Sequence, residues 1–128
     1  MRSSIIGAKM FFFDTYALWE LVKKNPRYSP YASGKIVCSV FQAYEFYVTL
    51  RRECNKETAE KYVSLLDDCL VEISIQNIIA AVEMKKQYSK QDVSFIDCLG
   101  YLKAKELGIK FLTGDKEFEK FPNVEFVK

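Results

Sequence analysis

The sequence contains no histidine, and its four cysteines are scattered without a CxxC pair. Zinc sites with the usual cysteine and histidine spacing are therefore excluded, as are catalytic triads and acid–base schemes that need an imidazole. Apolar runs are short, and none approaches the roughly 20 residues that a membrane-spanning helix needs. Charge is nearly balanced, with 19 basic and 17 acidic side chains, so the net charge of +2 does not by itself indicate a nucleic-acid partner.

The rest of the composition is typical of one globular domain. The chain has 128 residues, of which 49% are hydrophobic and 28% charged. We expect a single domain over residues 10–128, preceded by an N-terminal extension, residues 1–9. Cys38 and Cys69 have apolar neighbours, which predicts buried free thiols in a reducing compartment. Because no segment looks like a secretion signal, we expect a cytoplasmic protein with no membrane partner.

Short apolar runs alternate with segments of helical periodicity. Strands are expected over residues 11–13, 35–40, 71–74, 109–113 and 123–127, and helices over residues 15–24, 41–53, 57–70, 75–88 and 94–108, with one helical turn over residues 116–121. The strands are short and apolar on both sides, which is typical of a largely parallel sheet covered by helices on both faces. The sequence therefore predicts an α/β fold.

Four acidic residues follow or lie close to the ends of expected strands. Asp14 comes directly after one strand, and Asp115 follows another strand with only Gly114 between them. Glu45 lies in the second turn of the helix after the second strand, and Asp97 in the first turn of the last long helix. Sites in open α/β sheets form beyond the carboxyl ends of the strands. We therefore expect these four carboxylates to converge at one end of the sheet.

Each acid also has a simpler interpretation when it is taken alone. Asp14 and Asp115 fit helix N-caps, and Asp97 has the capping-box spacing from Ser94. Glu45 can be a solvated side chain that pairs locally. The set is harder to explain in this way, because clustered anions repel and are costly to bury without a counter-ion. Mg²⁺ or Mn²⁺ takes oxygen ligands and needs no histidine, so the pattern favours metal-assisted phosphodiester chemistry.

Four segments, FFFDTYAL, SVFQAYEF, SFIDCLGYLKAKELG and KFLTGDKEF, occur in this order along the chain. With these motifs the chain resembles the PIN-domain family, particularly its small VapC-type toxins, from residue 9 to residue 127. The resemblance implies a PIN-like α/β/α fold and a catalytic quartet that binds metal, namely Asp14, Glu45, Asp97 and Asp115. The three aspartates would be the principal ligands, with Glu45 holding a water or a second ion.

The same resemblance implies a function and partners. Proteins of this type are Mg²⁺- or Mn²⁺-dependent endoribonucleases, and many are the toxin of a toxin–antitoxin pair and form homodimers. We therefore expect an RNA substrate, a homodimer and an antitoxin partner. The alternative is a catalytically silent PIN-like module that binds RNA or protein. A phosphotransfer enzyme with Asp14 as nucleophile is a third hypothesis, but the phosphatase type needs an aspartate at the position of Tyr16.

Residues around the quartet are expected to support it. Thr15 and Thr113 flank the acids and can orient a ligand or contact phosphate, although capping and turn hydrogen bonds are equally typical of threonine there. Asp92 is either an additional acid of the site or a loop or N-cap residue. Four basic residues are expected to contact RNA, with a plain solvated surface as the alternative: Arg27, Lys35, Arg51 and Arg52.

Overall fold

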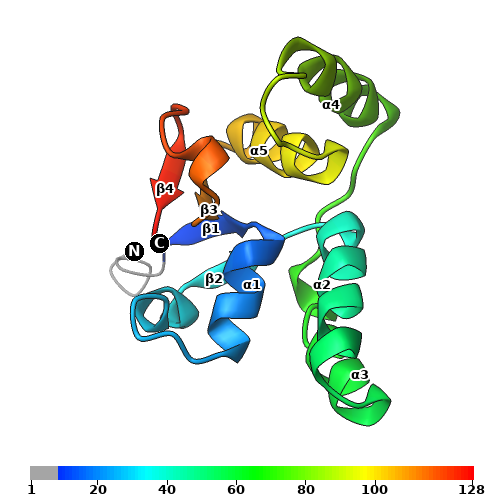
Figure 1. Cartoon of the computed structure of the whole chain (residues 1–128), viewed down its shortest axis with the longest axis vertical. Coiled ribbons are helices and arrows are strands. Elements are labelled where there is room, and N and C mark those ends of the chain that lie inside the picture. Colours follow the sequence, from blue (N-terminus) through cyan, green and yellow to red (C-terminus); the bar gives the residue numbers. More distant parts are fainter. Residues whose placement is uncertain (1–8) are drawn as a thin grey trace, which may run out of the picture.

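The structure is a computed structural model that describes residues 9–128. Its centre is a sheet of four parallel strands in the spatial order β2, β1, β3, β4 (Figure 1). The strands are β1 (Met10–Phe13), β2 (Lys35–Val37), β3 (Lys110–Thr113) and β4 (Val124–Phe126). The prediction of a mainly parallel sheet is confirmed. The expected extension, residues 1–9, falls almost entirely outside the described residues.

Helices cover both faces of this sheet, which confirms the predicted α/β/α layers. The α-helices are α1 (Thr15–Val22), α2 (Val40–Glu53), α3 (Lys56–Ser64), α4 (Ile75–Gln87) and α5 (Phe95–Leu107), and the short 3₁₀ helices are η2 (Ser29–Ser33), η3 (Asp67–Cys69) and η4 (Lys116–Phe118). In Figure 1, α4 and α5 lie on one side of the sheet and α1, α2 and α3 on the other. No helix within residues 9–128 is long and apolar enough to cross a membrane.

The phenylalanines of β1 show how both faces of the sheet are filled. Successive side chains of a strand point to opposite faces, so Phe12 and Phe13 enter different cores. Phe12 packs with Phe111 and the residues of α4 and α5, whereas Phe13 packs with Leu112 and the residues of α1 and α2. All four side chains are fully buried, and each contributes about 1.5–3 kcal/mol of hydrophobic stabilisation.

Helix α5 approaches the sheet closely at Gly100. A Cβ atom at this position would lie 3.0 Å from the ring of Phe111 and 2.9 Å from Nε2 of Gln42, so a larger residue would push the helix away. The helix ends at Gly108, as predicted, with the left-handed φ of 72° that glycine adopts without strain. This packing holds the first turn of α5, and with it Asp97, near the carboxyl end of β1.

The expected strand over residues 71–74 is wrong. Only one residue pairs with the sheet edge here, through a bridge between Leu70 and Cys38. The chain then leaves the sheet because Ser74 caps α4. The preceding helix also ends earlier than expected, at Ser64, since Leu66 turns into the core and η3 follows. Likewise, β2 is shorter than the expected 35–40 because Ser39 already caps α2.

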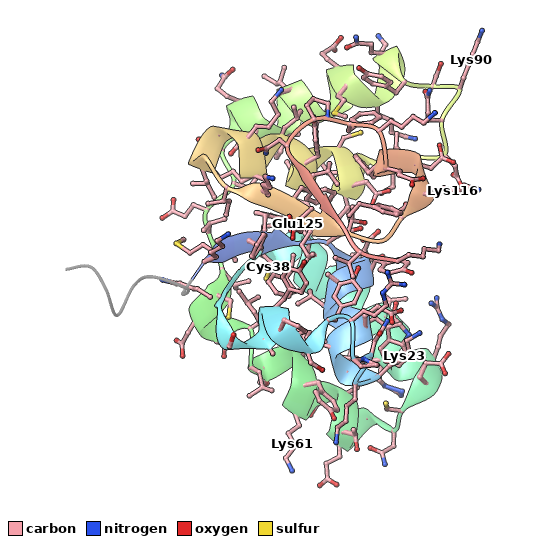
Figure 2. The ribbon with its side chains drawn as sticks, turned by 90° about the vertical axis from the view of Figure 1, so that its left-hand side faces the viewer. Lys23, Cys38, Lys61, Lys90, Lys116 and Glu125 are labelled. Atoms are coloured by element: carbon pink, nitrogen blue, oxygen red, sulfur yellow. The ribbon has the colours of Figure 1, made fainter. Side chains whose placement is uncertain are left out.

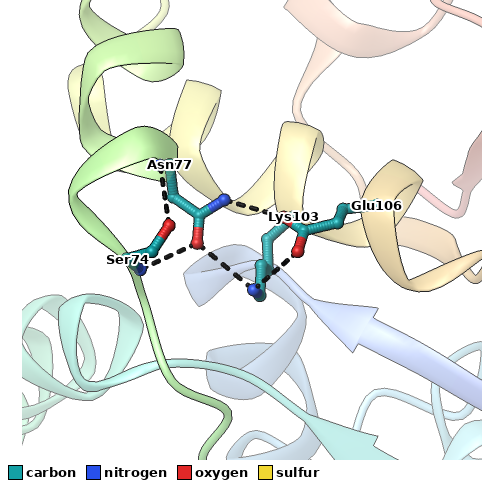
Figure 3. Close-up of polar contacts among 4 residues, drawn as sticks. All are labelled: Ser74, Asn77, Lys103 and Glu106. Carbon is teal, nitrogen blue, oxygen red and sulfur yellow. Dashed lines mark hydrogen bonds and ion pairs between the residues drawn. The ribbon is translucent and has the colours of Figure 1, made fainter.

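A buried lysine joins α4 to α5. Lys103 is 8% exposed, and its Nζ lies 3.2 Å from Asn77 Oδ1 and 3.3 Å from Glu106 Oε2 (Figure 3). Asn77 donates to Glu106 over 2.7 Å and forms a capping box with Ser74 at the start of α4. The ammonium group is therefore paired and hydrogen-bonded, which offsets the cost of removing it from water.

All four cysteines are free, which confirms the prediction of free thiols at Cys38 and Cys69. Cys38 is fully buried, and Figure 2 shows it towards the middle of the molecule, whereas the labelled lysines Lys23, Lys61 and Lys90 lie at the periphery. Burial raises the pKa of the Cys38 thiol to about 12, so this group stays protonated and unreactive at neutral pH. Cys69 is only half-buried, which differs from the expectation.

Candidate active site

Asp14 is a buried carboxylate, only 3% exposed, at the carboxyl end of β1. Its Oδ1 accepts a hydrogen bond of 2.8 Å from the Thr15 backbone, which caps α1. Its Oδ2 accepts a hydrogen bond of 2.6 Å from the hydroxyl of Thr113, on the adjacent strand β3. Both oxygens are thus held in place by two different elements. The capping interpretation of Asp14 is correct, and it accounts for only one of the two oxygens.

The other three carboxylates approach from separate elements. Glu45, on α2, accepts a hydrogen bond of 2.8 Å from the Thr15 hydroxyl. Asp97, in the first turn of α5, accepts one of 2.9 Å from the Ser94 backbone. Asp115, directly after β3, caps η4. The three aspartates therefore cap helices, as their spacings predicted, whereas Glu45 is bonded to a residue 30 positions away in the chain.

The pKa shifts of two of the aspartates indicate that the acids influence one another. Burial and the charges of Asp97 and Glu45 together raise the pKa of Asp14 to about 8, against the lowering effect of the hydrogen bonds from Thr113 and Thr15. Burial also raises the pKa of Asp97 to about 6, with the charges of Glu45 and Asp115 acting in the same direction. The fold therefore brings the acids close enough to disfavour one another's ionisation.

No basic side chain within residues 9–128 forms an ion pair with any of the four acids. The ion pairs of the described structure join Lys23 to Glu20, Lys56 to Glu60 and Lys103 to Glu106. The negative charge of the quartet is therefore not balanced by the chain itself. A divalent cation would balance it, because Mg²⁺ and Mn²⁺ prefer carboxylate oxygens.

The donor chemistry fits such an ion, but the side chains are not yet arranged around one. Within residues 9–128, no group of three or more acidic or cysteine side chains is placed to hold a metal. Asp97 faces the Ser94 backbone, and Asp115 Oδ1 accepts from the Glu117 backbone over 3.0 Å. Each cap uses one carboxylate oxygen, so the second oxygen of Asp97 and of Asp115 remains for an ion.

The two threonines expected beside the acids both contact them. Thr15 donates its hydroxyl to Glu45, and Thr113 donates to Asp14 while accepting from the Asp115 backbone over 3.0 Å. Asp92 differs, because its side chain is exposed and only its backbone reaches the region, donating to Glu117 over 3.3 Å. Asp92 therefore does not share the hydrogen bonds of the quartet.

The four basic residues expected to contact RNA lie in different places. Lys35 begins β2, so it lies at the amino end of the sheet, opposite the acids. Arg27 lies in the exposed turn after α1, and Arg51 is exposed on α2. Arg52 lines a surface hollow of about 340 Å³ together with Thr15 and Glu45. Of these four residues, Arg52 is thus the one that the structure brings next to the quartet.

Three residues that the sequence reasoning did not assign to the site also shape it. Gln42 is buried, and it binds Ser39 and donates over 3.3 Å to the Ile96 carbonyl, which ties α2 to α5 beside Asp97. Gly114 leaves room for Tyr16, whose ring would lie 2.4 Å from any Cβ atom there. The third is Tyr44, an exposed residue that lines the hollow beside Thr15 and Glu45. The S-x-x-Q capping spacing at residues 39–42 was the available signal for Gln42.

A larger hollow, of about 680 Å³, lies between α4, α5 and the segment after η4. Its lining includes Met84, Tyr88, Tyr101 and Phe121, and none of the four acids contributes to it. This hollow is therefore separate from the four acids, and perturbed carboxylates are a stronger indication of a chemical site than size.

Solved structures show the same fold. Mycobacterium tuberculosis VapC20, a toxin that cleaves the sarcin–ricin loop, matches with a TM-score of 0.75 and 19% identity, covering 92% of this chain and 99% of that one. A toxin–antitoxin complex from Klebsiella pneumoniae matches with a TM-score of 0.70 and 19% identity, covering 90% of this chain and 95% of that one. VapBC2 from Rickettsia felis, bound to a DNA fragment from its promoter, matches with a TM-score of 0.67 and 16% identity, covering 92% of this chain and 97% of that one.

The comparison of sequences identifies the family. No curated protein is significantly similar to the chain. The sequence model of the PIN domain, however, matches residues 11–124, which include β1, the quartet and the start of β4. The structural similarity extends over the same region. The chain therefore belongs to the PIN-domain family.

Proposed function

We propose that this protein is an endoribonuclease that depends on Mg²⁺ or Mn²⁺, formed by a single domain over residues 10–128. The observation that carries the proposal is the group of four mutually repelling carboxylates that no basic side chain of residues 9–128 neutralises. The absence of histidine from the sequence favours metal-assisted hydrolysis over schemes that use an imidazole. Membership of the PIN-domain family supports a nuclease.

In this proposal the three aspartates are the metal ligands. Asp14 is the fixed carboxylate, held by Thr113 and the backbone of Thr15. Asp97 and Asp115 would complete the oxygen ligands with the carboxylate oxygens that their caps do not use. When bound, Mg²⁺ or Mn²⁺ supplies the activation of water and the stabilisation of negative charge on the phosphate.

Glu45 has a separate task in this proposal. Its Oε1 is occupied by the Thr15 hydroxyl, so the side chain is oriented before substrate arrives. We assign its second oxygen, Oε2, to the attacking water, whose proton it accepts. Glu45 thereby acts as the positioned base, and the three aspartates act as ligands.

Cleavage of RNA tests this proposal. Purified protein is incubated with single-stranded and structured RNA in Mn²⁺, in Mg²⁺ and in excess EDTA. We expect cleavage only with metal, and a loss on the order of 100-fold for Asp97→Asn, since a charged ligand is removed. Asp68→Asn is the matched control, because Asp68 is exposed on η3, outside the quartet. Equal cleavage by Asp97→Asn, or full cleavage in EDTA, would contradict the proposal.

The alternative is a catalytically silent PIN-like module that binds RNA or protein. One observation favours it: within residues 9–128, no cluster of three or more acidic or cysteine side chains is already placed to hold a metal. A silent module would bind RNA without cutting it, and the Asp97→Asn protein would bind as the wild type does. The cleavage experiment separates the two functions directly.

We further propose that the protein acts in the cytoplasm as a homodimeric toxin with an antitoxin partner. The structural neighbours support the toxin and antitoxin parts of this proposal, because they include a VapC toxin and toxin–antitoxin complexes. Free cysteines are consistent with a reducing compartment. Induced expression should arrest growth of a bacterial host, whereas Asp97→Asn should not. Continued growth with active, soluble enzyme present would contradict the toxin assignment.

A further inference from the structure

We propose that the hollow between the start of α1 and the outer face of α2 is the track that holds single-stranded RNA beside the quartet, with Tyr44 stacking on a base and Arg52 binding a phosphate. This inference rests on the proposed nuclease function. It adds a binding surface and two positioning residues. The hollow has a volume of about 340 Å³ and is lined by Thr15, Tyr44, Glu45, Val48, Thr49 and Arg52.

The hollow is continuous with the proposed catalytic residues. Glu45 belongs to both. Thr15 also lines the hollow, and it donates its hydroxyl to Glu45 and its backbone N–H to Asp14. From there the lining follows α2 for two turns, from Tyr44 to Arg52, a distance of ~12 Å along the helix axis. A strand lying in the hollow would therefore pass directly from Arg52 to the acids.

Tyr44 presents an aromatic ring to solvent at the position next to Glu45. Its side chain is 64% exposed, although α2 buries other aromatic residues such as Phe46 in the core. It shares its exposed face of α2 with Val40 and Val48, which lie one helical turn before it and one turn after it. Such a face offers the flat apolar surface on which a base can stack, and every base has a π face.

Arg52 supplies the complementary charge. It is exposed, and within residues 9–128 it forms no ion pair, including with Glu45, whose Oε1 is engaged by Thr15. A guanidinium group binds phosphate oxygens in a bidentate manner. Arg51, its neighbour in sequence, does not line the hollow. An aromatic ring and a free guanidinium along one groove favour RNA over a peptide, since they match the alternating base and phosphate of a single strand.

Binding of RNA without cleavage tests the track. A short, fluorescently labelled single-stranded RNA of mixed sequence is titrated with the full-length protein in EDTA, and fluorescence anisotropy is measured at several salt concentrations. We expect Tyr44→Ala to weaken binding roughly 5- to 100-fold at every salt concentration, because a stacked base is lost. Tyr44→Phe should bind like the wild type, because it keeps the ring.

Arg52→Ala should also weaken binding, and it should lower the slope of log affinity against log salt by about 0.7, as expected for one lost phosphate contact with a single strand. Arg51→Ala should lose less affinity for RNA than Arg52→Ala. Lys61→Ala, which changes an exposed side chain of α3, should bind RNA as the wild type does. Thermal unfolding checks that Tyr44→Ala and Arg52→Ala remain folded, which is expected because both side chains are exposed.

The outcomes separate this inference from the nuclease proposal. If the wild type cleaves RNA with Mn²⁺ but Tyr44→Ala and Arg52→Ala bind RNA as the wild type does, the track is wrong and the nuclease stands. If both variants lose RNA binding but the wild type never cleaves, the track stands and the nuclease proposal fails. If the two variants keep RNA binding and lose a protein partner instead, the hollow is a protein-binding surface and the track is overturned.

Discussion

The hydroxyl of Thr113 donates a hydrogen bond of 2.6 Å to Oδ2 of Asp14, between two residues that are 99 positions apart in the chain. Strands β1 and β3 pair in parallel, so the two side chains meet where both strands end. Thr113 is fully buried, and its oxygen also accepts from the Asp115 backbone. One hydroxyl thus binds the carboxylate of Asp14 and the backbone of Asp115, two members of the quartet.

Replacing Thr113 by valine should weaken both the fold and the metal site. The change keeps the shape of the side chain but leaves Asp14 Oδ2 buried without its donor, which costs about 1–3 kcal/mol in the free energy of unfolding. We also expect Mn²⁺ affinity to fall about 10- to 100-fold, as is typical when a ligand loses its supporting hydrogen bond. Chemical denaturation and calorimetry measure the two effects. Thr113→Ser keeps the hydroxyl and should retain both properties, and an equal loss in both variants would contradict this role.

The free energy of unfolding should depend on pH, because the pKa values of two quartet aspartates are raised in the folded protein. The pKa of Asp14 in the folded protein is about 8, above its ordinary value of 3.8, so the folded state holds this proton more tightly than the unfolded state does. The contribution of Asp14 to stability is therefore largest at low pH and is lost as the pH rises from about 4 to about 8. Asp97, with a folded pKa of about 6, acts in the same direction.

The comparison of the metal-free wild type with Asp14→Asn isolates this contribution. We expect the free energy of unfolding of the wild type, relative to that of the variant, to fall as the pH rises across this range. Added Mn²⁺ should reverse the fall for the wild type at pH 8, because the cation neutralises the ionised carboxylates. A difference between the two proteins that stays constant with pH would show that Asp14 titrates normally.

The lack of a side chain at Gly114 should be required for the position of Asp115. A Cβ atom there would lie 2.4 Å from the Tyr16 ring and 2.4 Å from the Val127 carbonyl. Gly114→Ala should therefore destabilise the protein by about 1–3 kcal/mol and also reduce Mn²⁺ affinity, since the backbone next to Asp115 must move. Gly108→Ala is the control, because it strains a left-handed backbone in open space far from the acids. It should lower stability and leave Mn²⁺ affinity unchanged.

The contact between α4 and α5 should affect stability alone. Asn77→Ala removes an acceptor from the buried Lys103, a donor to Glu106 and the second half of a helix cap. We expect the free energy of unfolding to fall by about 1–3 kcal/mol, with RNA cleavage per folded molecule unchanged. Gln76→Ala, at the adjacent exposed position, should change stability by less than about 0.5 kcal/mol. A fall in cleavage of folded Asn77→Ala would mean that this network reaches the site.

Much of the fold could be predicted because its signals are local. The phenylalanines of β1, the cap of α5 at Gly108 and the alternation of strands with helices all depend on residues close in sequence. The expected strand at residues 71–74 failed for a tertiary reason, since an apolar segment pairs only where a neighbouring strand offers free backbone groups. Here only Cys38 offers them: its backbone N–H donates to the Cys69 carbonyl, and its carbonyl accepts from the Val71 backbone. The pairing ends there.

The candidate site was predictable in outline but not in detail. Strand ends and helix starts indicated which acids share one end of the sheet, and the same spacings indicated their caps. The bond from Thr113 to Asp14 and the bond from Gln42 to the Ile96 carbonyl depend on distant segments meeting, and no local pattern encodes them. The exposure of Tyr44 is similar, because the periodicity of α2 alone does not say which of its faces remains uncovered.

Binding of Mn²⁺ tests the central claim most directly, since the account requires Asp14, Asp97 and Asp115 to form one metal site beside Glu45. Isothermal titration calorimetry is performed on the wild type and on Asp14→Asn, Asp97→Asn and Asp115→Asn, with Asp68→Asn as control. We predict that the wild type and the control bind Mn²⁺ equally and that each of the three ligand variants binds at least about tenfold more weakly. Equal Mn²⁺ affinity in all five proteins, or no binding by the wild type, would contradict the account.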